Sequence, residues 1–71
     1  MYIYPNIRDI RENAKLTQIA VAEMLGTTQK QYSRWERGES EFPCHIVVEL
    51  AKIFRTTTDE LLRNGYPNDK T

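Results

Sequence analysis

The chain has few of the residues that mark disulfide-rich, secreted or membrane proteins. Its single cysteine among 71 residues excludes an internal disulfide framework and fits a reducing compartment. The opening letters, MYIYPN, include no basic segment followed by an apolar run, and no stretch is long enough to cross a bilayer. We therefore expect a cytoplasmic protein with neither a signal peptide nor a membrane anchor.

Glycine is also scarce, and no stretch alternates apolar and polar residues as a half-buried strand does. The chain has only three glycines and is rich in helix-forming residues. Seventy-one residues make one small domain with one modest core, without room for a second module that senses a ligand. These observations predict an all-α bundle.

Residue sets that perform catalysis or bind metals are missing as well. Cys44 and His45 are the only cysteine and histidine, and neighbouring side chains on a helix point about 100° apart. No further ligand completes a metal site, so we expect Cys44 to be a small core residue. The chain shows no paired carboxylates, phosphate-binding glycine loop or Ser/His/Asp set. We expect no enzyme activity, no metal and no cofactor.

What the sequence does contain is a pair of short helices joined by a tight turn, QIAVAEMLGTTQKQYSRWER at residues 18–37. The first helix is predicted from about Thr17 to Leu25. Gly26 follows where a helix often ends in a left-handed residue. Thr28 then caps the second helix, its hydroxyl accepting from the backbone amide of Gln31.

The apolar residues of this unit occur where two crossed helices need them. Val21 and Leu25 are one turn apart on the first helix, and Tyr32 and Trp35 are three residues apart on the second. The small side chain of Ala22 allows the second helix to approach closely. This spacing fits the helix-turn-helix of proteins that read the DNA major groove.

A polar arc covers the other side of the second helix. At about 100° per residue, it contains Gln29, Lys30, Ser33, Arg34 and Arg37. Glutamine pairs with adenine, arginine with guanine, and lysine with guanine or phosphate. The alternative is a solvated polar face of the kind that any surface helix has. Gln18, in the first turn of the preceding helix, is either a phosphate contact or an ordinary polar residue.

Before this unit, residues 1–5 form an apolar lead-in that packs either on the bundle or on a second copy. Asn6 is predicted to cap a first helix whose inward residues are Ile7, Ile10 and Ala14. The DNA-binding domain is expected to span residues 6–64.

After the unit, Pro43 is expected at the first helical position of a fourth helix that continues to Phe54. Thr57 caps a fifth helix, in which Leu61 and Leu62 point inward. Residues 65–71 are expected to form a frayed tail.

The zero net charge is unfavourable for binding nucleic acid, because such binding largely depends on neutralising phosphates. Residues 1–37 hold six basic and four acidic side chains, whereas residues 38–71 hold four and six. The acidic half therefore lies away from the second helix of the pair. We infer weak non-specific affinity, with more dependence on base contacts and on pairing of two copies.

The motifs together resemble a known family. The Leu16–Gln18 entry, the Ser33–Gly38 run and the closing Asp59–Leu62 segment are similar to the Cro/CI-type helix-turn-helix domain of lambda-repressor-like regulators, also called the xenobiotic-response-element type. The likeness covers about Ile7 to Leu62. It implies a five-helix bundle that binds double-stranded operator DNA, commonly as a homodimer on a palindromic site.

The resemblance also assigns roles to individual residues. It implies that Gln29, Lys30 and Arg34 read bases, with Ser33 adding a base or phosphate contact. Phosphate contacts are implied for Gln18 and Arg37, and Ser40 or a backbone amide near it remains able to reach a phosphate. Glu36 matches an acidic residue that pairs with a basic one on the first helix, here Arg11. Glu39 and Glu41 depart from the pattern, because members are frequently basic there.

Two functions follow from this reading. The first is a sequence-specific transcriptional regulator, with repression as the favoured direction. The alternative is a protein-interaction module, such as an antitoxin or adaptor subunit. The zero net charge, Ile19, Met24 and the apolar lead-in motivate this second reading.

Overall fold

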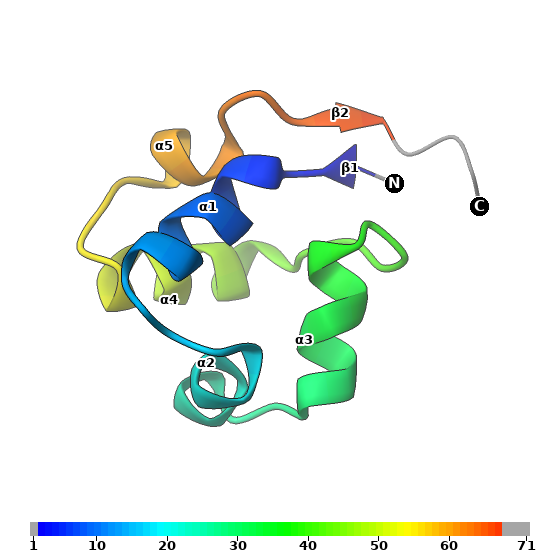
Figure 1. Ribbon diagram of the computed structural model, residues 1–71. Coiled ribbons are helices and arrows are strands. Elements are labelled where there is room, and N and C mark those ends of the chain that lie inside the picture. The colour runs from blue at the N-terminus through cyan, green and yellow to red at the C-terminus, as the bar shows by residue number, and fades with distance from the viewer. Residues whose placement is uncertain (1, 68–71) are drawn as a thin grey trace.

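The computed structural model describes residues 2–67, which form five helices and a short two-stranded ribbon (Figure 1). The helices confirm the predicted all-α five-helix bundle. In chain order the elements are β1 (Tyr2–Ile3), α1 (Pro5–Asn13), α2 (Gln18–Leu25), α3 (Gln29–Glu36), α4 (Cys44–Ile53), α5 (Thr58–Leu62) and β2 (Tyr66–Pro67).

Threonine caps begin three of the helices. The hydroxyls of Thr17, Thr28 and Thr57 each accept a hydrogen bond, at 3.1 Å, from the backbone amide three residues later. Each bond satisfies an amide that has no partner inside the helix. The predicted starts of α2, α3 and α5 are therefore confirmed.

Left-handed residues end the helices of the central pair. Gly26 after α2 and Gly38 after α3 both have φ of 74°. The amides that follow them, on Thr27 and Glu39, donate back to carbonyls of the preceding helix at 2.9 Å. This is the geometry of a Schellman-type helix end, and it makes both turns tight.

The core lies where the five helices meet. Tyr32 and Leu50 are fully buried within it. Its other apolar members are Ile7, Val21, Ala22, Trp35, Phe42, Ile46, Val47 and Leu61.

The start of α1 differs from the prediction. The helix begins at Pro5, and Tyr4 occupies the cap position without a side-chain hydrogen bond. The fixed φ of proline suits the first helical position, so the helix starts two residues earlier than predicted. Asn6 is then inside the helix, where its amide donates to the backbone carbonyl of Glu60 at 2.6 Å. It joins α1 to α5 instead of capping α1.

Other local predictions were also wrong. Pro43 is the cap residue of α4 and not its first helical residue. Ala14 and Cys44 are exposed, not inward. Leu62 is 38% exposed, because α5 is only five residues long and such a short helix turns few side chains toward the core.

The two ends of the described chain form an antiparallel ribbon that the sequence did not predict. Tyr2 is opposite Pro67, and Ile3 is opposite Tyr66. The lead-in packs on the bundle, with ring centroids of Tyr4 and Phe42 6.4 Å apart. The predicted tail is therefore partly a strand, while its last residues, 68–71, lie outside the described residues. Within residues 2–67, no helix has the length and apolar character needed to span a bilayer.

Candidate nucleic-acid interface

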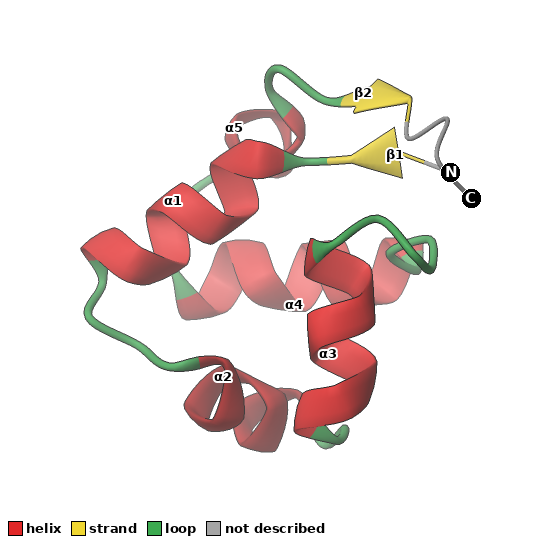
Figure 2. Ribbon diagram, turned by 45° about the vertical axis from the view of Figure 1, so that its right-hand side comes forward, coloured by secondary structure: helices red, strands yellow, loops and turns green. Residues whose placement is uncertain are grey.

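Helix α3 stands at one side of the bundle, next to α2 (Figure 2). Its aromatic side faces inward: Tyr32 is fully buried and Trp35 is 7% exposed. The two rings meet edge to face, with centroids 6.4 Å apart, and Trp35 also lies 5.7 Å from the ring of Phe42. This anchoring fixes which side of α3 remains open to solvent.

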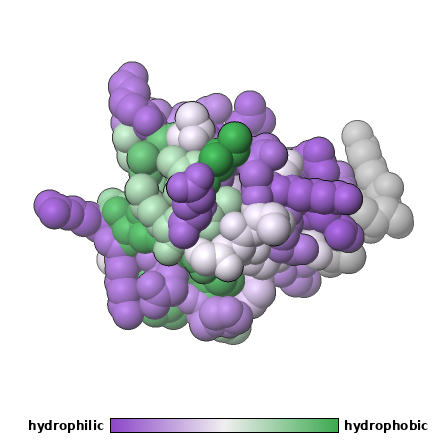
Figure 3. All heavy atoms as spheres, turned by 90° about the horizontal axis from the view of Figure 1, so that it is seen from below, coloured by the Kyte–Doolittle hydropathy of each residue, from purple (hydrophilic) through white to green (hydrophobic). Residues whose placement is uncertain are grey.

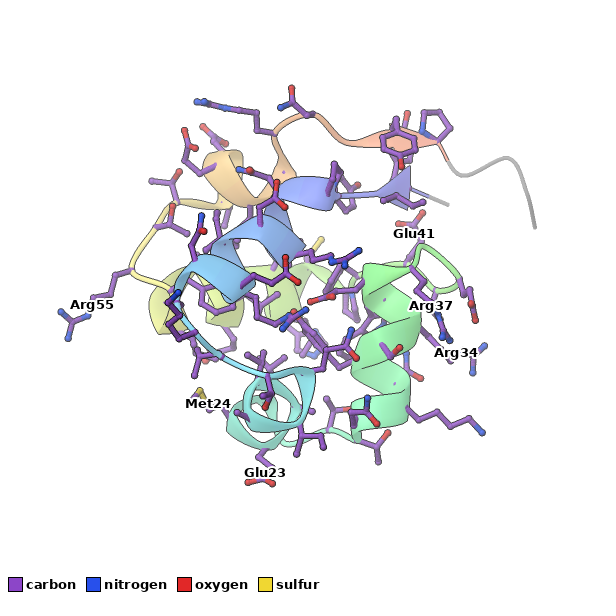
Figure 4. The ribbon with its side chains drawn as sticks, in the orientation of Figure 1. Glu23, Met24, Arg34, Arg37, Glu41 and Arg55 are labelled. Carbon is purple, nitrogen blue, oxygen red and sulfur yellow. The ribbon has the colours of Figure 1, made fainter. Side chains whose placement is uncertain are left out.

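The open side of α3 carries the polar arc. Gln29, Lys30, Arg34 and Arg37 are exposed, and Ser33 is half-buried. Figure 4 shows Arg34 and Arg37 directed away from the body of the molecule. The structure thus brings these five side chains together on one surface. Ser40 is half-buried in the loop that follows.

An ion pair connects α3 to α1. Arg11 Nε lies 2.7 Å from Glu36 Oε2, and the two side chains are only 9% and 4% exposed. A second guanidinium nitrogen, Nη1, donates to the Leu16 carbonyl at 2.8 Å. The pair implied by the resemblance is therefore present, and it attaches the end of α3 to the end of α1.

Two glutamines extend this ion pair to the surface. Gln18 Nε2 donates to Glu36 Oε1 at 3.0 Å. Gln29 Nε2 in turn donates to Gln18 Oε1 at 3.2 Å. Gln18 is the first residue of α2, and Gln29 is the first residue of α3. The hydrogen bonds therefore fix both side chains at the starts of two adjacent helices. Sequence reasoning identified both glutamines but did not predict that they are linked.

The charges of this network are well defined. Burial alone would raise the pKa of Glu36, but hydrogen bonds from Arg11 and Gln18 outweigh it and hold that pKa below its usual value. The hydroxyl of Tyr32 is buried beside the pair and makes no hydrogen bond of ordinary geometry to any described residue. Burial raises the pKa of Tyr32, so its phenol stays neutral.

A second ion pair lies at the end of α3, and sequence reasoning missed it. Arg37 Nε is 2.9 Å from Glu39 Oε2. The sequence contained a signal, because Gly38 between the two residues permits a sharp reversal. The Glu39 carboxylate therefore contacts Arg37, for which the resemblance implies a phosphate contact.

Two apolar features lie elsewhere on the surface. At the end of the molecule that carries α2, apolar and polar residues are interleaved (Figure 3), and Ile19 and Met24 are 56% and 55% exposed. A separate apolar groove of about 290 Å³ lies between the lead-in, α4 and α5. Its lining consists of Tyr4, Phe42, Cys44, Val47, Val48, Thr58 and Leu62.

The sequence profile of a helix-turn-helix family matches residues 7–61, which reach from α1 into α5. The chain belongs to the Cro/CI-type helix-turn-helix family. This family consists of DNA-binding transcriptional regulators. The two capped helices α2 and α3 are its helix-turn-helix.

Curated relatives are similar to this chain at low identity. An uncharacterized HTH-type transcriptional regulator of Bacillus subtilis, YqaE, is 32% identical over 65 residues, or 92% of this chain and 55% of that protein. The repressor protein C2 of Salmonella phage P22 is 33% identical over 57 residues, or 80% of this chain and 26% of the repressor. The chain thus spans about half the length of the first relative and a quarter of the second. No solved structure matches at a comparable level.

Proposed function

We propose that this protein is a sequence-specific regulator that inserts α3 into the major groove of double-stranded DNA. The observation that carries the proposal is the division of α3 into a buried aromatic side and an exposed polar side. A helix that reads bases with one side must be anchored to the protein by its opposite side, and Tyr32 and Trp35 provide this anchor. The Arg11–Glu36 pair attaches the same helix to α1.

Base reading is assigned to the exposed side chains near the start and middle of α3. Gln29 suits adenine, because its amide both donates and accepts, and Arg34 suits guanine through two parallel hydrogen bonds. Lys30 and Ser33 complete this set. The hydrogen bond from Gln29 to Gln18 reduces the freedom that Gln29 must lose on binding.

Phosphate contacts are assigned to both ends of the pair of helices. Gln18 lies in the first turn of α2, where free backbone amides favour an anion. Arg37 and Ser40 lie at and just after the end of α3. These contacts would set the register of α3 on the duplex without reading its sequence.

Repression is the direction of regulation that we favour. The similarity to a phage protein named as a repressor supports it. A bound domain can act by occupying an operator, which needs no further module. A cytoplasmic location, where DNA is accessible, is part of this proposal.

A homodimer on a palindromic site completes the proposal. The Cα trace measures 29 × 24 × 21 Å, a size that allows two copies to occupy half-sites one DNA turn, roughly 34 Å, apart. The apolar groove is the surface we assign to this contact, since Val48 and Leu62 on its lining are 45% and 38% exposed. A two-fold contact needs one patch to supply both a projection and a hollow.

Selection of bound duplexes from a random library tests the proposal. We expect enrichment of one half-site of a few base pairs, repeated in inverted orientation about one DNA turn apart. Enrichment of no sequence, with no binding to any duplex at low salt, would contradict it.

A protein-interaction module, such as an antitoxin or adaptor subunit, is the second candidate. Two exposed apolar residues on α2, Ile19 and Met24, and the zero net charge favour it. Isolation of a stoichiometric protein partner, together with absence of DNA binding at low salt, would support this candidate over the first.

A further inference from the structure

The end of α3 carries an ion pair between residues only two positions apart. Arg37 Nε lies 2.9 Å from Glu39 Oε2, and Arg37 Nη2 donates to Glu39 Oε1 at 3.3 Å. The carboxylate thus contacts two guanidinium donors, which is also how arginine binds a phosphate. Both side chains remain accessible to solvent, at 59% and 45% exposed.

The turn after α3 holds these two side chains together. Gly38 is left-handed, with φ of 74°, and the Glu39 amide donates to the Arg34 carbonyl at 2.9 Å. The chain therefore reverses directly after the helix and returns Glu39 to the side of Arg37. The pairing follows from this helix end and not only from two long side chains.

From this arrangement we propose that Glu39 is an intramolecular competitor that binds Arg37 in place of a DNA phosphate. The inference rests on the proposed function, because it needs a duplex at α3. A phosphate must displace the carboxylate before Arg37 can neutralise it. Glu39 therefore weakens binding to every sequence alike.

Base reading is affected differently from phosphate binding. Arg34, which is exposed one turn earlier on α3, is directed away from the body of the molecule (Figure 4). Within residues 2–67, its side chain forms neither a hydrogen bond nor an ion pair with Glu39. Because Glu39 reduces the sequence-independent term only, more of the remaining binding free energy comes from bases. The consequence is a regulator that resides less on non-operator DNA.

The experiment compares Glu39→Gln with Glu49→Gln on a non-operator duplex at several salt concentrations. Glu49 is the matched control, since it is 54% exposed and pairs with Lys52 at 3.5 Å on α4. We expect Glu39→Gln to bind about three-fold more tightly than Glu49→Gln at low salt. The plot of log affinity against log salt should also become steeper by about one unit.

An Arg37→Ala background shows whether the effect passes through Arg37. There, the gain from Glu39→Gln should fall to that of Glu49→Gln. Equal behaviour of the two variants in the wild-type background, or a gain that persists without Arg37, would overturn the inference while leaving the proposed function intact. Failure of the wild-type protein to bind any duplex would overturn both.

Discussion

At the scale of single residues, the two exposed arginines of the α3 surface should separate sequence reading from general attachment. Arg34→Ala should cost about 1–3 kcal/mol on the selected site and relax the preference at one base pair. Arg37→Ala should weaken the binding of all duplexes by a similar factor, and this factor should be smaller than the effect of Arg34→Ala on the selected site. The reason is that Arg37 contacts a phosphate, and the phosphate must already compete with Glu39 for Arg37. Fluorescence anisotropy with the selected site and its single-base variants measures both. An Arg34→Ala protein with unchanged site preference would contradict the assignment.

Glu36 should be important for stability even though it does not contact DNA in our proposal. Its partner Arg11 has a side chain only 9% exposed, so Glu36→Gln leaves a buried guanidinium without a counter-charge. We expect the free energy of unfolding to fall by about 3 kcal/mol, measured by urea denaturation. Glu12→Gln, which removes one carboxylate from an exposed pair with Arg8, serves as the control and should change stability by less than about 1 kcal/mol.

The pH dependence of stability should report the same carboxylate. The pKa of Glu36 is lowered in the folded chain, so the unfolded chain binds more protons as pH falls below the usual value of about 4.3. The stabilisation from Glu36 is therefore fully present above that pH and is lost as pH decreases through its folded pKa. Urea midpoints measured from pH 6 to pH 3 should fall more steeply for the wild-type protein than for Glu36→Gln. Parallel curves would contradict this.

At the scale of elements, the turn between α2 and α3 depends on backbone conformation alone. Gly26 has φ of 74°, and a Cβ added there would meet no atom within 4 Å. Gly26→Ala should thus lower the free energy of unfolding by about 1 kcal/mol, purely from the left-handed backbone. Lys15 after α1 is also left-handed, with φ of 63°, so Lys15→Gly should relieve the same kind of strain. Thermal denaturation that shows lower stability for Gly26→Ala and higher stability for Lys15→Gly would support this account. Unchanged stability of Gly26→Ala would contradict it.

The helix-turn-helix was predictable because its rules are local. Thr17 and Thr28 each accept a hydrogen bond from an amide three residues away, and Gly26 ends α2 through hydrogen bonds to carbonyls of its last turn. The outward side of α3 followed from the burial of its aromatic residues. These features need no knowledge of distant parts of the chain.

Features that depend on distant residues were not predictable in the same way. Asn6 contacts the carbonyl of Glu60, 54 positions away, and its identity as a good capping residue pointed to the wrong role. The ribbon pairs two-residue strands from opposite ends of the described chain, too short to show any alternation. Gln18 approaches Glu36 only because α2 and α3 cross. In each case the partner is set by the packed bundle.

At the scale of the whole molecule, the proposed dimer is testable through the apolar groove. Leu62 lines the groove and is 38% exposed, so Leu62→Glu places a charge in the proposed contact and should shift sedimentation toward the monomer. Met24→Glu is the control, because Met24 is 55% exposed on α2 and does not line the groove.

Binding to an isolated half-site should stay unchanged in both variants. Binding to the full palindrome should weaken about 10²-fold for Leu62→Glu only, since two linked half-sites act through effective concentration. A dimer that persists in Leu62→Glu would move the contact to another surface, and a wild-type monomer on the palindrome would remove it.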